Sequence, residues 1–157
     1  MYYHNIALLL GNRLLWSVGS AWFLAQALKI VTNFFKEKKI NLHRFVEPGG
    51  MPSSHAAMVI ALLVGVGIKE GIPSTIFIVT LVFSLAIIYE AIGVRRAVGN
   101  QAEILNQIIS KLPQREQIKF QDKKGKKLLK ETIGHSPLEV VVGSIIGLIM
   151  ALIWLGK

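Results

Sequence analysis

The sequence contains no cysteine, nine acidic residues and five prolines among its 157 positions. The absence of cysteine excludes disulfide bridges, thiolate nucleophiles and cysteine-ligated zinc or iron–sulfur centres. The shortage of carboxylates leaves 18 lysines and arginines unbalanced, and the formal net charge is +9. Any chemistry that the chain performs must therefore rest on histidines, hydroxyls, cations and a few carboxylates.

Apolar residues are abundant: 52% of positions are hydrophobic, 17% are charged, and the mean hydropathy is +0.51. This is too apolar for an ordinary soluble domain, so the charged and apolar residues must be segregated along the chain. Four apolar stretches approach the roughly 20 residues that a helix needs to cross a bilayer. They cover 14–35, 52–68, 72–88 and 137–155. The sequence predicts an all-α membrane bundle with about four transmembrane helices, in one domain over 1–157; a soluble protein with buried helices is the alternative.

The positive residues are concentrated in two loops. Four lie in 34–50 and ten in 93–135, whereas the turn between the second and third stretches holds only Lys69. With four spans, both basic loops fall on one membrane face, which the positive-inside rule makes cytoplasmic, with both termini outside. We therefore expect an integral protein of a bacterial plasma membrane, although an anionic substrate would also select cations on its own side. The segment 1–5 lacks the positive charge of a signal peptide, and we expect it to be retained at the membrane interface.

The second basic loop forms an extramembrane insertion at about 97–133. Apolar residues recur in it at helical spacing from Ala102 to Leu112, until Pro113 ends the pattern, which predicts an interfacial amphipathic helix. A run of lysines follows over 119–130. Because this run has little aromatic interleaving, we interpret it as a solvated loop near anionic lipid headgroups and expect no nucleic-acid partner.

The motif Gly-Gly-Met-Pro-Ser-Ser-His-Ala occupies 49–56, at the start of the second stretch. Ser53 and Ser54 open a helix there, whose free N–H groups and positive dipole end would form a cradle for a phosphate. A simple N-cap would explain the serines. It would not explain His55 just inside a membrane helix, where ionisable groups are uncommon and usually functional.

A second polar motif, Gly-His-Ser-Pro-Leu-Glu, precedes the last stretch at 134–139. His135 and Glu139 are four residues apart. If the helix begins at or before His135, they share a helix face and the carboxylate can hold the imidazole in one tautomer. A neutral, oriented imidazole is a competent nucleophile. The alternative is structural, since Ser136 and Glu139 also match a capping box with Pro137 at the first helical position.

Positively charged side chains complete the set of candidate site residues. Arg95 and Arg96 close the third stretch, and adjacent helical residues point about 100° apart, so one arginine can face inward as a phosphate fork while flanking charge explains the other. In the first stretch, Gln26 and Lys29 share a face, and either phosphate binding or snorkelling explains Lys29. Nucleophile, acid and fixed positive charge together suit phosphoryl transfer. The histidines and carboxylates form no metal-binding pattern, and we expect no metal or other cofactor.

Three blocks resemble the divergent branch of the type 2 phosphatidic-acid phosphatase family, whose superfamily includes the vanadium-dependent haloperoxidases. They are Gly-Gly-Met-Pro-Ser-Ser-His-Ala (49–56), Gly-Val-Arg-Arg-Ala-Val-Gly-Asn-Gln-Ala (93–102) and Gly-His-Ser-Pro-Leu-Glu-Val (134–140). The resemblance implies that His135 attacks phosphorus, that His55 is the general acid and that Glu139 orients the nucleophile. The phosphate-binding residues it implies are Lys29, Ser53, Ser54, Arg95 and Arg96.

The sequence departs from the family pattern in several ways. Ser54 replaces a family glycine, Glu139 replaces an aspartate, and the Lys-x6-Arg-Pro block is missing. The family keeps an arginine close before its nucleophilic histidine, whereas Leu129 holds that position here and the arginines precede the basic insertion.

The expected function is an integral-membrane lipid phosphate phosphatase that acts through a phosphohistidine. Its substrate would be phosphatidylglycerophosphate, phosphatidic acid or a polyprenyl pyrophosphate. One alternative is a non-catalytic membrane protein that binds anionic lipid or phosphate, and a vanadate-dependent oxidase is another. Gly143 and Gly147 form a small-xxx-small pair that permits close helix packing, either within the monomer or in a homo-oligomer.

Overall fold

The computed structural model describes residues 8–38, 49–113, 116, 129 and 134–156. Within these residues it is helical, and its long helices are α2 (Arg13–Glu37), α3 (Ser54–Glu70), α4 (Thr75–Ile92), α5 (Val94–Ser110) and α7 (Pro137–Leu155). The four apolar stretches thus correspond to α2, α3, α4 and α7, which confirms the predicted all-α membrane bundle. The expectations for segment 1–5 and for the lysines of 119–130 lie outside the described residues.

Polar caps determine where the apolar helices begin. The Ser53 hydroxyl accepts from the Ala56 N–H at 3.3 Å, and the Ser74 hydroxyl accepts from the Phe77 N–H at 3.2 Å. The first N–H groups of a helix have no partner within the helix, and hydrocarbon offers none. The caps therefore mark the helix ends as positions at the membrane surface.

The helix dimensions suit a bilayer. Helix α2, the continuous helix from Thr75 to Ser110 and helix α7 are long and apolar enough to cross one. Helix α3 has 17 residues, about 25 Å at 1.5 Å per residue, which is at the lower limit for a spanning helix. Large apolar side chains cover the outside of the bundle, for example Phe23, Phe83 and Ile153, each about 60% exposed. Such a surface fits contact with lipid.

Small residues hold α2, α3 and α7 together. The buried core consists of Ala21, Ala25, Ala57, Ala61 and Ile146. A Cβ atom added at Gly143 would overlap the Ser53 carbonyl oxygen, and one added at Gly147 would overlap the Ala57 carbonyl oxygen. The small-xxx-small pair of α7 is therefore used within the chain, where it brings the starts of α3 and α7 together.

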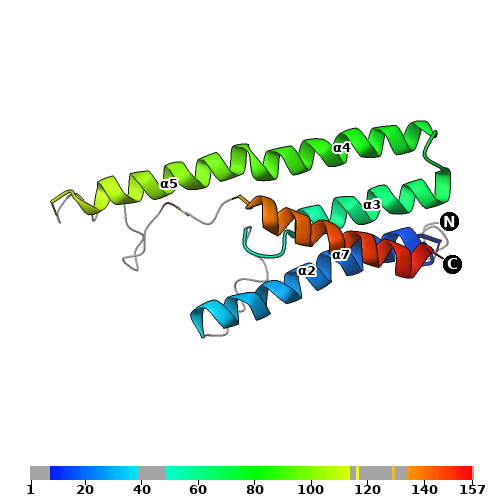
Figure 1. The fold of residues 1–157 in the computed structure, drawn as a ribbon, viewed down its shortest axis with the longest axis horizontal. Helices are drawn as coiled ribbons and strands as arrows, with labels where there is room; N and C mark the ends of the chain where they lie inside the picture. The colour runs from blue at the N-terminus through cyan, green and yellow to red at the C-terminus, as the bar shows by residue number, and fades with distance from the viewer. Residues whose placement is uncertain (1–7, 39–48, 114–115, 117–128, 130–133, 157) are drawn as a thin grey trace.

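Helix α5 continues from α4 after Gly93, and in Figure 1 it runs on in the same direction, away from the other helices. Together they form a helix of 36 residues, about 54 Å long, which exceeds a hydrocarbon core of about 30 Å. The helix predicted from Ala102 is thus confirmed, but it begins at Val94 and follows the direction of α4. Its location at a membrane interface stays a prediction.

Chain direction places the functional motifs at one end of the bundle. Helices α2 and α4 end there and α3 and α7 begin there, whereas the start of α2 and the end of α7 lie at the opposite end (Figure 1).

Candidate active site

The starts of α3 and α7 meet and form the centre of the site. The Ser53 N–H donates to the Glu139 carbonyl oxygen at 2.9 Å. Ser53, Ser54 and His135 are all buried. Two positive helix ends consequently converge on one location, a favourable environment for an anion.

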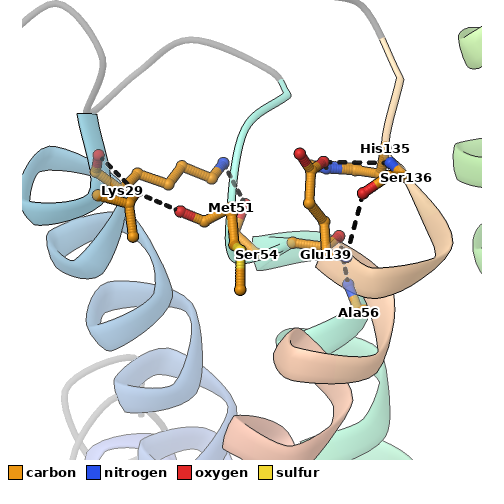
Figure 2. Close-up of polar contacts among 9 residues, drawn as sticks. Lys29, Met51, Ser54, Ala56, His135, Ser136 and Glu139 are labelled. Carbon is orange, nitrogen blue, oxygen red and sulfur yellow. Dashed lines mark hydrogen bonds and ion pairs between the residues drawn. The ribbon is translucent and has the colours of Figure 1, made fainter. Parts of the chain in front are cut away.

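His135 is held by Glu139 on the first turn of α7 (Figure 2). The His135 Nδ1 lies 3.0 Å from the Glu139 Oε2, which also accepts from the Ser136 N–H at 3.2 Å. The Ser136 hydroxyl in turn accepts from the Glu139 N–H at 3.3 Å. The capping box and the His–Glu pair, alternatives in the sequence, therefore coexist. Because an ionised carboxylate only accepts, Nδ1 carries the proton and the Nε2 lone pair is available to a substrate.

The second histidine faces the first across the two helix ends. The ring centroids of His55 and His135 are 6.1 Å apart, with the ring planes at 61°. The two imidazoles are therefore neighbours at the point where the helix ends meet, as a shared role as nucleophile and acid requires. His55 lies on the first turn of α3, whereas His135 directly precedes the N-cap of α7, so the two residues do not both lie on helices; the close packing of α3 on α7 fixes the separation of the rings.

Lys29 enters the site from α2, on the other side of the start of α3 (Figure 2). Its ammonium donates to the Ser54 hydroxyl at 3.1 Å, and the residue is 4% exposed. A snorkelling lysine would extend its ammonium into solvent, so this burial favours phosphate binding. Glu139 lies within electrostatic range of the ammonium. Nearby, Thr32 Oγ1 lies 2.6 Å from the Met51 carbonyl oxygen and ties α2 to the segment that precedes α3.

The segment before His135 is fixed to the junction of α4 and α5. The His135 N–H donates to the Ala91 carbonyl oxygen at 3.1 Å. Gly134 has φ +102°, and a Cβ atom there would lie 2.5 Å from the N and Cα atoms of Arg96. Only glycine combines this backbone conformation with so close an approach.

This junction also determines where the two arginines lie. Arg95 interacts electrostatically with His55, and its Nε donates to the Glu90 Oε1 at 3.0 Å. The backbone of Arg96 contacts Gly134, and Arg96 is an exposed residue. An arginine far from His135 in sequence therefore lies at the edge of the site through tertiary packing.

The structure brings most of the predicted site residues together. His55, His135, Glu139, Lys29 and Ser54 surround the starts of α3 and α7, and Arg95 lies at the margin. Ser53 is fully buried and serves as the cap of α3.

Sequence reasoning gave no role to Thr32 and Gly134. Thr32 lies three residues after Lys29 and so on the same helix face, which was a weak indication that its hydroxyl is near the site. Nothing in the sequence indicated the contact of Gly134. Among the described residues, no group of three or more histidines, aspartates or glutamates could hold a metal ion.

These features define a helical membrane protein in which two histidines, a buried lysine and two helix starts meet at one end of the bundle. The family model described as "Divergent PAP2 family" matches residues 10–150. The chain therefore belongs to this family and is a membrane protein related to the PAP2 phosphatases, as the sequence blocks predicted.

A relative supports the membrane assignment. "Uncharacterized membrane protein YuiD" of Bacillus subtilis (strain 168) is 35% identical over 150 residues, which cover 92% of this chain and 95% of YuiD. No solved structure matches the chain.

Proposed function

We propose that the protein is a metal-independent phosphatase that hydrolyses a phosphomonoester or pyrophosphate of a membrane lipid. The observation that carries the proposal is the His135–Glu139 pair at 3.0 Å, which faces His55 at a ring separation of 6.1 Å. Capping alone would not require either imidazole. Family membership supports the same reaction class.

In the first half-reaction, the His135 Nε2 attacks phosphorus while Glu139 retains the proton on Nδ1. The P–N bond forms as the bond between phosphorus and the lipid oxygen breaks. His55, protonated at this stage, gives its proton to the departing oxygen as the general acid. The products are a phosphohistidine and a lipid alcohol, or a lipid monophosphate when the substrate is a pyrophosphate.

In the second half-reaction, His55 accepts a proton from a water molecule that attacks the phosphohistidine. The P–N bond breaks, inorganic phosphate leaves, and His135 returns to its neutral form with the proton still on Nδ1. Both histidines thus end as they began, which closes the cycle.

Charge stabilisation comes from three sources. Lys29 supplies a buried ammonium 3.1 Å from the Ser54 hydroxyl, and Arg95 adds charge at the margin. Helix geometry leaves the N–H groups of Ser54 and His55 without intrahelical partners, so they can bind phosphate oxygens. Preorganised donors of this kind supply much of the acceleration in phosphoryl transfer.

The substrate is a lipid because the site lies at the end of a bundle whose apolar surface faces the bilayer. The basic loops on the same side support a cytoplasmic site in a bacterial plasma membrane. This orientation favours lipid phosphates made inside the cell, such as phosphatidylglycerophosphate or phosphatidic acid. An outward site would favour a polyprenyl pyrophosphate.

The test is release of inorganic phosphate from these three lipids by purified protein in detergent with chelator. We expect turnover of at least one lipid, and its loss in His135→Ala and His55→Ala. A brief reaction with lipid labelled at the phosphate should leave acid-labile label on the intact protein and none on His135→Ala. Turnover that survives His135→Ala would refute the mechanism.

One observation favours a second function. The Arg95 side chain is 39% exposed and paired with Glu90, an arrangement that also suits a protein that holds a lipid phosphate without cleaving it. Binding of the three lipids with no phosphate release would establish this non-catalytic role.

A further inference from the structure

A buried amide below the phosphate site has an oxygen without a hydrogen-bond partner among the described residues. Gln26 is 6% exposed, and among the described residues its Oε1 is one of two buried side-chain atoms that lack a hydrogen bond. The other, the Ser17 hydroxyl, can rotate toward a carbonyl of its own helix. A carboxamide has no such local solution, and buried polar groups are nearly always satisfied.

Gln26 lies directly beneath the site along α2. It precedes Lys29 by three residues, so the two side chains share a helix face. The rise of an α-helix places Gln26 about 4.5 Å farther from the site end than Lys29. Because the Lys29 ammonium already reaches Ser54 at 3.1 Å, the amide lies on the membrane side of the phosphate cradle.

A bound lipid phosphate would present its first groups beyond the phosphate at this depth. In a glycerol lipid these groups are ester or hydroxyl oxygens, whereas in a prenyl phosphate they are hydrocarbon. A carboxamide can both donate and accept hydrogen bonds. Next to hydrocarbon, the carboxamide would lack a hydrogen-bond partner, which costs free energy where water is absent.

We propose that Gln26 is a specificity-determining residue that hydrogen-bonds the glycerol portion of the substrate and so selects glycerol-based over prenyl lipid phosphates. This inference rests on the proposed phosphatase function and assigns the substrate class of the same site. One lost hydrogen bond with a stranded partner corresponds to about a tenfold preference.

The test compares dioleoyl phosphatidic acid with farnesyl monophosphate in identical mixed micelles. For the intact protein we expect kcat/KM to favour phosphatidic acid about tenfold or more, and for Gln26→Leu we expect this ratio to fall toward one. Leucine has a similar volume and removes a stranded polar group, so the melting temperature should not fall. Ser17→Ala removes the other unpartnered group of α2, far from the site, and should preserve the ratio.

Two results would overturn the proposal. One is an intact protein that hydrolyses farnesyl monophosphate as well as phosphatidic acid. The other is Gln26→Leu with an unaltered ratio, because a purely structural role would change both substrates in proportion.

A separate measurement distinguishes failure of this inference from failure of the phosphatase function. If the intact protein releases phosphate from neither lipid, the two lipids are competed against a fluorescent phosphatidic acid for binding. Preference for phosphatidic acid that disappears in Gln26→Leu would sustain Gln26 as the selective residue in a non-catalytic binding protein. Equal competition by the two lipids in the intact protein would overturn the inference as well.

Discussion

Replacing Glu139 with glutamine tests the His–Glu pair most directly. The Glu139 Oε2 contacts the His135 Nδ1 at 3.0 Å and the Ser136 N–H at 3.2 Å. Glutamine has the same shape and can still accept from the Ser136 N–H through its carbonyl oxygen. Because Oε2 makes both contacts, the same carbonyl oxygen would also accept from the Nδ1–H, so the tautomer is kept and the negative charge that stabilises the ring during attack is lost.

The magnitude of the loss follows from the missing charge. A hydrogen bond to a charged group contributes about 1.5–3 kcal/mol. We expect Glu139→Gln to lower phosphate release about 10- to 10²-fold, or roughly 1.5–3 kcal/mol of transition-state stabilisation. Glutamine preserves the capping box with Ser136, so the variant should remain folded.

The assay is phosphate release from the best lipid substrate, with thermal unfolding in the same detergent as the check on folding. Glu103→Gln is the matched control, because Glu103 is an exposed carboxylate on α5 and its neutralisation should leave turnover unchanged. A folded Glu139→Gln protein that retains turnover within about threefold of the intact protein, less than the loss of a charged hydrogen bond predicts, would refute the role of the pair.

Three further substitutions test other parts of the site. Gly134→Ala places a Cβ atom against the junction of α4 and α5, at positive φ, and should lower phosphate release at least about tenfold by displacing the attached histidine. Lys29→Met removes a charged donor, which corresponds to about ten- to hundredfold in kcat/KM, while the exposed Lys69→Met should have no effect. Gly143→Leu collides with the start of α3 and should lower the melting temperature in detergent. A Cβ atom at Gly19 meets no atom within 4 Å, so Gly19→Leu should not; equal melting temperatures would contradict the packing of α3 on α7.

The helices were predictable from the sequence because their signals are local. Long apolar runs specify α2, α3, α4 and α7, and the capping box of Ser136 and Glu139 marks the start of α7. The pairing of His135 with Glu139 was expected from their spacing, but not for the right reason. Helix α7 begins at Pro137, so the two residues do not share a helix face, and the Glu139 carboxylate reaches back past the N-cap to His135.

Which of the two arginines lies at the site was not predictable, since it depends on a contact between distant segments. Gly134 must adopt a positive φ and approach the backbone of Arg96 before α5 can bring Arg95 to the site. Likewise, Gly143 and Gly147 fit an intramolecular or an intermolecular interface equally well in the sequence. Only the packed helices show that they contact α3 of the same chain.

The hydrogen bond between the His135 N–H and the Ala91 carbonyl oxygen, at 3.1 Å, joins residues 44 positions apart, since 135 − 91 = 44. The segment between Ala91 and His135 is therefore a loop whose two ends are joined by this hydrogen bond. The free-energy cost of closing a loop grows only slowly with its length. Most of this segment can therefore be lengthened, shortened or exchanged for another sequence, provided that Arg95 and Gly134 remain at its two ends, without moving the histidines of the site.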